Sequence, residues 1–336
     1  MASTNSHNSP PLNAQWLKAG LLYHTLNFFY LKKFGKKIRK LSLDAGFNCP
    51  NRDGTLATGG CVFCDPESFS PSRRLGLSSI TAQLEEGIRR LKARYAAGGF
   101  VAYFQPGTNT YAPVDRLRSV FEEALAHPKV VGLVIGTRPD CVPDDVLDLL
   151  AELSKRTYLI IEYGLQSIHN RSLDWIKRGH HFQAFLDAYK RSRKRNLLVG
   201  VHVILGLPGE TSEDMLATAR ELAGLEIHSV KLHNLYAVRN TLLADMVARG
   251  EVELPQFDDY VCRVVDFLEL LPPECVIDRL SGDAPTQYLI GPDWCLDKTA
   301  VRAAVEAEFR RRGTWQGSGF RVQGSGFGIC KEWSIY

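Results

Sequence analysis

The sequence predicts an α/β fold built on a parallel sheet, and two observations lead to this prediction. Short apolar runs typical of buried strands alternate with amphipathic stretches typical of helices, from residue 40 to residue 236. Parallel strands need crossover connections, and the helical stretches supply them. We therefore expect a partial barrel of about six strand–helix units, (β/α)6, with a C-terminal helical extension. A doubly wound open sheet is the alternative.

Each predicted strand is a nearly continuous apolar run, as expected when helices cover the sheet. In order, these runs occupy residues 40–46, 100–105, 130–137, 158–165, 198–207 and 229–236. The helices between them carry apolar residues at intervals of three and four, and they occupy residues 79–97, 114–127, 143–156, 182–195 and 212–225. Ser78 or Ser79 is a suitable N-cap for the first helix, and Thr211 or Ser212 for the last.

The chain divides into three predicted parts. Residues 1–15 are polar and Pro-rich, so we expect a disordered N-terminus. Residues 16–255 carry the strand–helix units of the barrel. Residues 256–336 contain two helical stretches and no clear further unit, and we expect a C-terminal helical cap there.

The composition is that of a globular protein, with 336 residues and a net charge of +4. Basic runs at 31–40 and 190–195 are either solvated faces or a footprint for a phosphate backbone. No stretch has the length of a membrane-spanning helix, and no signal peptide is evident, so we expect a cytoplasmic protein without a membrane partner. Its eight cysteines should then be reduced thiols, which favours metal binding over disulfides.

Unusual motifs follow the predicted strands. They comprise the cysteine-containing loop 43–71 and the segments 105–111, 137–140, 162–167, 206–211 and 235–241. The loops after the strands of a parallel barrel form its active face. We therefore expect these six segments to meet at one opening.

Three cysteines stand in the first of these loops: Cys49, Cys61 and Cys64. A structural zinc site needs four ligands, and only His180 or His181 could complete one through folding. A [4Fe–4S] cluster bound by three thiolates would instead keep one iron open for a small molecule. The spacing of the cysteines alone does not decide between a zinc site and a [4Fe–4S] cluster. The remaining cysteines are Cys141, Cys262, Cys275, Cys295 and Cys330. They are either small buried hydrophobic residues, or they bind a second cluster or include a thiol that relays a radical.

The motifs together resemble a known family. The stretches "DAGFNCPNRDG", "GGCVFC", "YFQPGTNTYAP", "GTRPDC", "EYGLQS", "ILGLPGET" and "VKLHNLYAVRNT" occur in this order. They resemble the YhcC-like (YtqA-like) family of radical S-adenosylmethionine (radical SAM) enzymes, which is related to the radical SAM domain of the Elongator catalytic subunit. The spacer between the first two cysteines is longer than in most of the superfamily, and the Gly-Gly-Glu motif of many relatives is absent.

The resemblance implies a radical SAM partial TIM barrel and a definite chemistry. Cys49, Cys61 and Cys64 would bind a [4Fe–4S] cluster and be the catalytic cysteines. The reduced cluster would cleave S-adenosylmethionine (SAM) to methionine and a 5′-deoxyadenosyl radical, which abstracts hydrogen from the substrate. An electron donor such as flavodoxin or ferredoxin would reduce the cluster.

The resemblance also implies contacts to SAM. Phe63 would cover the cluster or the adenine, and Glu162 would bind the ribose. Gln105, Thr108 and Asn109 would contact the amino group of SAM, and Arg138 would bind its methionine carboxylate. Ile204 and the turn at Gly206 would contact the adenine. The structural alternatives are a Glu162–Arg138 ion pair, capped turns at 105–109, and core packing for Phe63 and Ile204.

Three classes of function remain open for the substrate. The relation to the Elongator domain and the basic runs favour tRNA, with modification of a wobble uridine. The motifs "ILGLPGET" and "EYGLQS" also resemble oxygen-independent coproporphyrinogen dehydrogenase, so a small molecule such as a porphyrinogen is the second class. A non-enzymatic protein that binds metal or nucleic acid is the third. Candidates for contact with the substrate are His180, His233, Tyr236 and Arg239.

Overall fold

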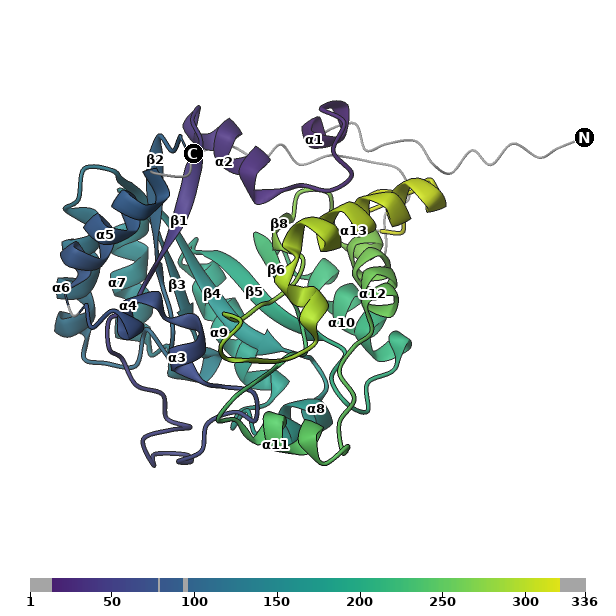
Figure 1. Ribbon diagram of the computed structural model, residues 1–336. Helices are drawn as coiled ribbons and strands as arrows, with labels where there is room; N and C mark the ends of the chain where they lie inside the picture. The colour runs from purple at the N-terminus through teal and green to yellow at the C-terminus, as the bar shows by residue number, and fades with distance from the viewer. Residues whose placement is uncertain (1–13, 78, 93–95, 321–336) are drawn as a thin grey trace, which may run out of the picture.

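A computed structural model describes residues 14–77, 79–92 and 96–320 of the chain (Figure 1). Its main feature is a curled sheet of seven parallel strands in the order β1-β2-β3-β4-β5-β6-β8. The strands are β1 (Ile38–Leu43), β2 (Gly99–Phe104), β3 (Val130–Thr137), β4 (Tyr158–Gln166), β5 (Leu198–Leu205), β6 (Ser229–Asn234) and β8 (Val276–Arg279). Consecutive strands are neighbours throughout, which is the topology of a partial barrel and not of a doubly wound sheet. The predicted fold class is confirmed.

The helices that cross between strands agree with the predicted ones. They are α5 (Ile80–Lys92), α6 (Val114–Leu125), α7 (Asp144–Ser154), α9 (Phe182–Lys194) and α10 (Ser212–Gly224). The Ser79 hydroxyl accepts a hydrogen bond from the amide of Ala82, and Thr211 forms a capping box with Asp214, so both predicted N-caps are confirmed. Ser78, the other candidate N-cap of α5, lies outside the described residues.

Shorter elements connect or flank these units. The helices are α1 (Gln15–Lys18), α2 (Leu26–Phe34), α3 (Pro66–Phe69), α4 (Pro71–Arg74), α8 (Asn170–Trp175) and α11 (Leu242–Ala248). Two short strands, β7 (Ala237–Val238) and β9 (Leu289–Gly291), pair in antiparallel fashion. No helix in the described ranges has the length and apolar character needed to cross a bilayer.

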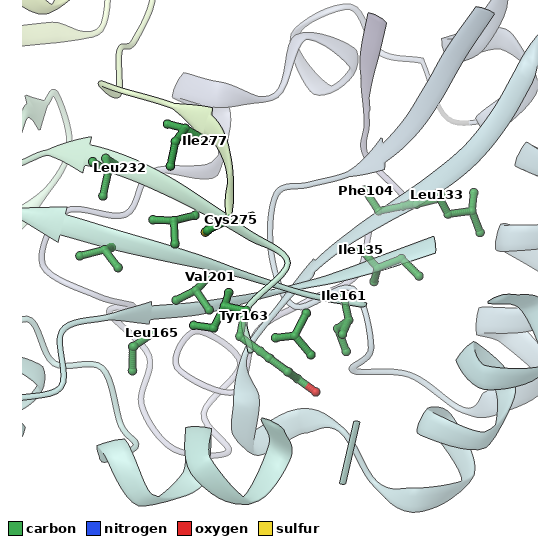
Figure 2. Close-up of a cluster of buried hydrophobic side chains, with 14 of the residues drawn as sticks. Phe104, Leu133, Ile135, Ile161, Tyr163, Leu165, Val201, Leu232, Cys275 and Ile277 are labelled. Carbon is green, nitrogen blue, oxygen red and sulfur yellow. The ribbon is translucent and has the colours of Figure 1, made fainter. Parts of the chain in front are cut away.

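The outer face of the sheet carries the main hydrophobic core. Alternate strand residues face the covering helices, and Figure 2 shows ten of the buried residues of this core with labels, among them Phe104, Ile135 and Val201. These side chains form one contiguous cluster with apolar residues of the crossover helices. Because every second residue faces outward, the residues between them face the inside of the curled sheet.

Helix α2 covers the inside of the barrel at the amino ends of the strands. Its Tyr30 is buried in a cluster with Ile38, Val101 and Tyr158, which lie near the start of β1, β2 and β4. Figure 1 shows α2 at the opposite end of the sheet from α3 and α8. Helix α2 therefore closes the inner face at the amino ends of the strands, and the end with the carboxyl termini remains for a site.

The C-terminal region differs from the prediction in one respect. Helices α12 (Phe257–Leu270) and α13 (Lys298–Arg312) form as predicted, and α12 packs against α10. Between them, however, β8 pairs in parallel with β6, with Val276 opposite Ser229. The sheet thus has seven strands and not about six, because part of the expected helical cap at 256–336 belongs to the barrel.

One ion pair joins the two edges of the curled sheet, between Lys40 of β1 and Asp278 of β8. It spans the gap where an eighth strand would close a full barrel. The backbone of Thr25, just before α2, forms a parallel bridge to Ile277 of β8. In the N-terminal segment 1–15, which the sequence predicts to be disordered, residues 1–13 lie outside the described residues, and Gln15 begins α1.

Candidate active site

A cavity of about 450 Å³ lies at the carboxyl ends of the strands. Residues of the cysteine loop and of segments 105–111, 137–140, 162–167 and 235–241 line it, as the sequence predicts. The segment 206–211 does not contribute to the lining, and the residues that reach the cavity from the preceding strand β5 are His202 and Ile204. Five of the six motifs therefore meet at one opening.

Specific hydrogen bonds fix the cysteine loop against the barrel. The Asn51 side chain donates to the carbonyl oxygens of Lys177 and Arg178, at 2.8 and 3.0 Å. The Gly60 amide donates to the Asn51 carbonyl at 2.7 Å, and Gly60 has a φ of +75°, which favours glycine. Asn51 thus fixes the loop that carries Cys49, Cys61 and Cys64 to the segment that follows α8.

All three cysteine thiols line the cavity. Cys61 is buried, and its sulfur accepts contacts from Asn51 Nδ2 at 3.6 Å and from an Arg178 guanidinium nitrogen at 3.5 Å. Burial, together with the neighbouring Cys61 and Cys49, raises the pKa of the Cys64 thiol to about 12. The three sulfurs therefore share one electrostatic environment, with N–H donors directed at one of them.

The donor set fits a cluster better than a single ion. In the described ranges, no three His, Cys, Asp or Glu side chains are close enough to share one metal ion. His181 pairs with Asp174 on the surface, and His180 does not line the cavity, so neither completes a zinc site with the cysteines. A four-iron cluster instead takes each thiolate on a separate iron, which needs a wider arrangement.

Arg178 supplies positive charge beside the thiols. Its side chain is buried, donates two hydrogen bonds to the Gly164 carbonyl, and contacts Cys61 Sγ. Within the described part of the chain it forms no ion pair with a carboxylate. An isolated buried guanidinium is costly, and the negative charge of a thiolate-bound cluster would compensate it. The three cysteines and Arg178 together fit a [4Fe–4S] group.

Arg138 lies close to Arg178 and is almost fully buried. It forms a two-pronged ion pair with Asp140, at 2.9 and 2.7 Å, and donates to the carbonyl of Arg178. The alternative Arg138–Glu162 ion pair is wrong, because Asp140 is the partner of Arg138 and other bases surround Glu162. Arg138 also lines the cavity, although all three of its nitrogens already donate, two to Asp140 and one to the Arg178 carbonyl.

The predicted SAM-contacting residues fall into two groups. Phe63, Gln105, Thr108 and Ile204 line the cavity, and the buried Thr108 hydroxyl has no hydrogen-bond partner. Asn109 does not line the cavity. Its side-chain amide donates to the carbonyls of Phe104, Pro106 and Gly136, so it holds the turn together, as the structural alternative for 105–109 predicts.

Gly206 also lies outside the cavity lining. Its φ is +92°, and an added Cβ would stand 2.9 Å from Pro255 Cγ. The glycine therefore permits a close approach of the segment before α12, and its backbone does not border the cavity. The contact of the turn at Gly206 with the adenine stays a prediction, and in the structure this turn packs against Pro255.

Glu162 lies at the floor of the cavity and is the centre of a buried ionic network. Its Oε1 accepts from Lys40 Nζ at 2.8 Å, and its Oε2 accepts from His202 at 2.7 Å and lies 3.5 Å from Lys231 Nζ. Burial alone would raise the pKa of Glu162, but Lys231, Lys40 and His202 outweigh it and hold this pKa well below the usual range. Glu162 is thus an anion with both oxygens engaged.

Lys231 and Lys40 differ although both contact Glu162. Lys40 makes hydrogen-bonded pairs with Glu162 and Asp278, and these raise its pKa in spite of burial. Lys231 donates to the Tyr103 hydroxyl at 2.7 Å and has only the longer contact to Glu162, so burial lowers its pKa to about 8. At the cavity floor, Lys40 therefore stays protonated well above neutral pH, whereas the pKa of Lys231 is about 8.

Lys231 should make stability depend on pH. Its pKa is lower in the folded chain than the usual 10.5, so between pH 8 and about 10.5 the unfolded chain binds more protons. The free energy of unfolding of the wild type, relative to Lys231→Gln, should therefore rise as pH rises through this window. Denaturant unfolding at several pH values measures it, with exposed Lys190→Gln as the matched control. A difference that falls with pH would contradict the account.

Several residues of the site escaped the sequence prediction: Asn51, Tyr103, Arg178, His202 and Lys231. The signal for three of them was the strand periodicity, since Tyr103, His202 and Lys231 alternate with outward-facing apolar residues. Asn51 and Arg178 gave no such signal, because they come together only through the fold. Of the four candidates for substrate contact, His233 and Tyr236 line the cavity, and His180 and Arg239 do not.

The remaining cysteines lie away from the cavity lining. Cys275 and Cys295 are buried, Cys141 and Cys262 are partly exposed, and Cys330 lies outside the described residues. Cys141 and Cys262 make only long contacts to carboxylates, Asp140 and Glu308. In the described part of the chain these cysteines make no disulfide, and a second cluster or a radical-relaying thiol stays a prediction.

Several residues of the two basic runs form ion pairs within the protein. In the run 190–195, Arg191, Arg193 and Arg195 form ion pairs with acidic residues. In the run 31–40, Lys40 points into the barrel floor, and α2 lies at the end opposite the cavity. Neither run borders the cavity, which favours the interpretation of the runs as solvated faces.

Comparison with known families gives two matches that together cover the barrel from the cysteine loop onward. Residues 49–222 match the model described as "Radical SAM superfamily", and residues 227–311 match the one described as "Radical_SAM C-terminal domain". The uncharacterized protein YtqA of Bacillus subtilis is 42% identical over 299 residues, which is 89% of this chain and 93% of that protein.

A more distant relative and a solved structure extend the comparison. The tRNA uridine(34) acetyltransferase of Methanocaldococcus jannaschii is 25% identical over 169 residues; the match covers 49% of this chain and 30% of that enzyme. The structure of Methanocaldococcus infernus Elp3 with an N-terminal deletion is 18% identical, with a TM-score of 0.64, and the match covers 83% of this chain and 64% of that one. The last comparison supports the fold alone.

Proposed function

The chain belongs to the radical SAM superfamily, and on this premise we propose which residues perform its chemistry and on what substrate. Membership makes it an enzyme that uses a [4Fe–4S] cluster and SAM and requires a reductant. When bound, these cofactors supply a reductive cleavage of SAM to a 5′-deoxyadenosyl radical that takes hydrogen from the substrate. The substrate and the residue roles are the proposal.

Cys49, Cys61 and Cys64 are the proposed cluster ligands. The observation that supports this most is their convergence on one cavity, with the uncompensated guanidinium of Arg178 beside Cys61 Sγ. Asn51 and Arg178 direct N–H groups at that sulfur and so orient it, a role that outer-shell residues perform at many metal centres. Reduced thiols at these positions accord with a location in the cytoplasm.

SAM would lie along the lining next to the cysteines. The unpartnered Thr108 hydroxyl and the Gln105 side chain offer hydrogen bonds to its amino group, and Arg138 offers its guanidinium to the carboxylate. Phe63 and Ile204 offer apolar surface to the adenine. Glu162 is less suited to the ribose than the resemblance implies, because both its oxygens already accept from bases of the floor.

A tRNA is the substrate class we favour, with a wobble uridine as the modified nucleotide. The support is the tRNA uridine(34) acetyltransferase among the relatives, together with the excess of basic side chains that line the cavity. The two basic runs contribute little to this argument, since the arginines of the run 190–195 are paired and neither run lines the cavity. A flavodoxin or ferredoxin would supply the electron.

The experiment that tests this substrate uses reduced, reconstituted enzyme with SAM and unfractionated tRNA. We expect tRNA to accelerate formation of 5′-deoxyadenosine, and we expect nucleoside mass spectrometry to show an altered wobble uridine. Binding should weaken as salt rises, because counterions are released from the phosphates. Unchanged tRNA nucleosides, with consumption of a porphyrinogen in the parallel reaction, would contradict the proposal.

A further inference from the structure

The wall of the cavity formed by β6 and β8 has no role in the account above. Cysteines, Arg138 and Arg178 occupy the side proposed for the cluster and SAM. The residues of this wall are His233 near the end of β6, Tyr236 just after it, Arg279 at the end of β8, and Asp283 just beyond β8. A substrate that meets the SAM-derived radical has to lie against this second wall.

The charges that line the cavity do not balance. Six basic side chains border it and two acidic ones: Arg52, Arg74, Arg138, Arg178, Lys231 and Arg279, against Glu162 and Asp283. Each acid is already shared between bases, since Glu162 contacts Lys40 and Lys231, and Asp283 contacts Lys298 and Arg279. Arg138 is paired with Asp140 outside the lining, and Arg178 lies beside the proposed cluster, so Arg52, Arg74 and Arg279 remain without a hydrogen-bonded carboxylate among the described residues. This excess of positive charge favours an anionic ligand.

Arg279 is the least compensated base of the second wall. Its guanidinium lies 3.8 Å from Asp283, beyond hydrogen-bond distance, whereas Lys298 takes the same carboxylate oxygen at 2.8 Å. No other ion pair of Arg279 occurs within the described ranges. Its side chain is about one-third exposed, so its planar N–H fork is open to a ligand in the cavity.

His233 adds an unpartnered polar atom next to Arg279. Its Nε2 is buried and has no hydrogen-bond partner, and its ring stacks on His202 with centroids 5.5 Å apart. Gly282 packs directly against it, since a Cβ there would stand 2.6 Å from His233 Nδ1 and 2.7 Å from Tyr236 Cε1. The rings of His233 and Tyr236 are thus held in place, and His233 Nε2 is left free to hydrogen bond a ligand.

Arg74 approaches the same cavity from the β1 edge of the sheet. It lies at the end of α4, its guanidinium is 5.8 Å from the centre of the Tyr288 ring, and one nitrogen donates to the carbonyls of Glu67 and Ser68. Among the described residues it has no carboxylate partner. The cavity therefore has one guanidinium from each edge of the curled sheet, Arg74 and Arg279.

We propose that the β6–β8 wall is a phosphate subsite, in which Arg279, with Arg74 opposite, binds a phosphate of the substrate and His233 hydrogen bonds a neighbouring polar atom. Planar guanidinium groups match phosphate oxygens in a two-pronged geometry. The proposal rests on the function proposed above in taking the phosphate to be that of a nucleotide. It requires no covalent step beyond the radical chemistry, and it would position the reacting group.

The test measures binding of three probes to the reconstituted chain with SAM: inorganic phosphate, uridine and uridine 5′-monophosphate. Equilibrium dialysis gives Kd without reference to turnover. We expect the monophosphate to bind at least about tenfold more tightly than uridine, and Arg279→Gln to remove most of that difference. Arg279→Lys, which keeps the charge and loses the fork, should retain part of it.

Two further variants complete the design. Arg74→Gln changes an exposed position and should weaken monophosphate binding in the same direction as Arg279→Gln. Arg302→Gln on α13, a comparably exposed arginine, is the matched control and should change Kd by less than about twofold. Thermal unfolding of each variant checks that the fold is intact.

The outcomes separate this inference from the proposed function. If inorganic phosphate binding depends on Arg279 and the uridine moiety adds nothing, the subsite is correct and the nucleotide substrate is wrong. If the monophosphate binds wild type and both the Arg279→Gln and Arg74→Gln variants equally well, the phosphate subsite is wrong, whatever the tRNA experiment shows.

Discussion

The Cys61→Ala variant should fold but should fail to retain the iron that the wild type holds. After anaerobic reconstitution and desalting, we expect about four irons per chain in the wild type and close to none in the variant, because two thiolates cannot replace three around an open cluster. Cys61 is buried at the point where Asn51 and Arg178 direct their N–H groups, so its loss removes the best-oriented ligand.

Iron and sulfide analysis measures this effect directly. Cys262→Ala is the matched control, since Cys262 lies on α12 away from the cavity and makes only a 4.0 Å contact with Glu308. This control should retain the wild-type iron content. Full iron retention in Cys61→Ala, or tight zinc binding by the wild type in place of iron, would contradict the assignment of the loop.

Glu162→Gln should destabilise the fold by about 3 kcal/mol or more, the cost typical of breaking a buried ion pair. The amide keeps the shape of the side chain but leaves Lys231 and Lys40 without their shared anion. Lys40 retains Asp278, whereas Lys231 retains only the Tyr103 hydroxyl as a close partner. The loss should therefore arise mainly at Lys231.

Denaturant unfolding of the wild type and the variant measures this loss. Glu226→Gln is the matched control, because Glu226 is exposed and pairs with Arg193 at 3.0 Å on the surface, where such pairs contribute less than about 1 kcal/mol. Equal, small losses for the two variants would show that the floor network does not stabilise the fold.

The fold was predictable because periodicity and order were consistent along the chain. Apolar strands and amphipathic helices alternated, and consecutive strands did become neighbours. The seventh strand was missed since β8 has only four residues and ends in Asp278 and Arg279, too short and too polar to read as an apolar run. Helix α2 was missed as an element too, because its apolar residues pack against the barrel interior without a clear one-sided pattern.

The site was predictable where a motif encodes it. The cysteines and the residues of "QPGT" line the cavity because they follow strands directly, and the carboxyl ends of parallel strands share one edge. Arg178 and Asn51 could not be predicted, since only folding brings the segment after α8 against the cysteine loop. The partner of Arg138 was also missed, although Asp140 is two residues away, because the expectation looked to the more distant Glu162.

We assign three tasks to one cavity. In our proposal the cysteine loop and Arg178 hold the cluster, and the residues after β2 and β3 bind SAM. The floor around Glu162 connects the two edges of the sheet through Lys40 and Asp278. Lys40 and Lys231 of the floor already contact Glu162, so in our proposal Arg74 and Arg279 remain for the substrate.

Formation of 5′-deoxyadenosine tests the central claim most directly. The chain is purified without oxygen, reconstituted with iron and sulfide, reduced, and supplied with SAM. The account predicts 5′-deoxyadenosine in the wild type and none above background in Cys61→Ala, with Cys262→Ala equal to the wild type. A reconstituted wild type that binds iron and SAM yet releases no 5′-deoxyadenosine under reducing conditions, or a Cys61→Ala variant as active as the wild type, would contradict it.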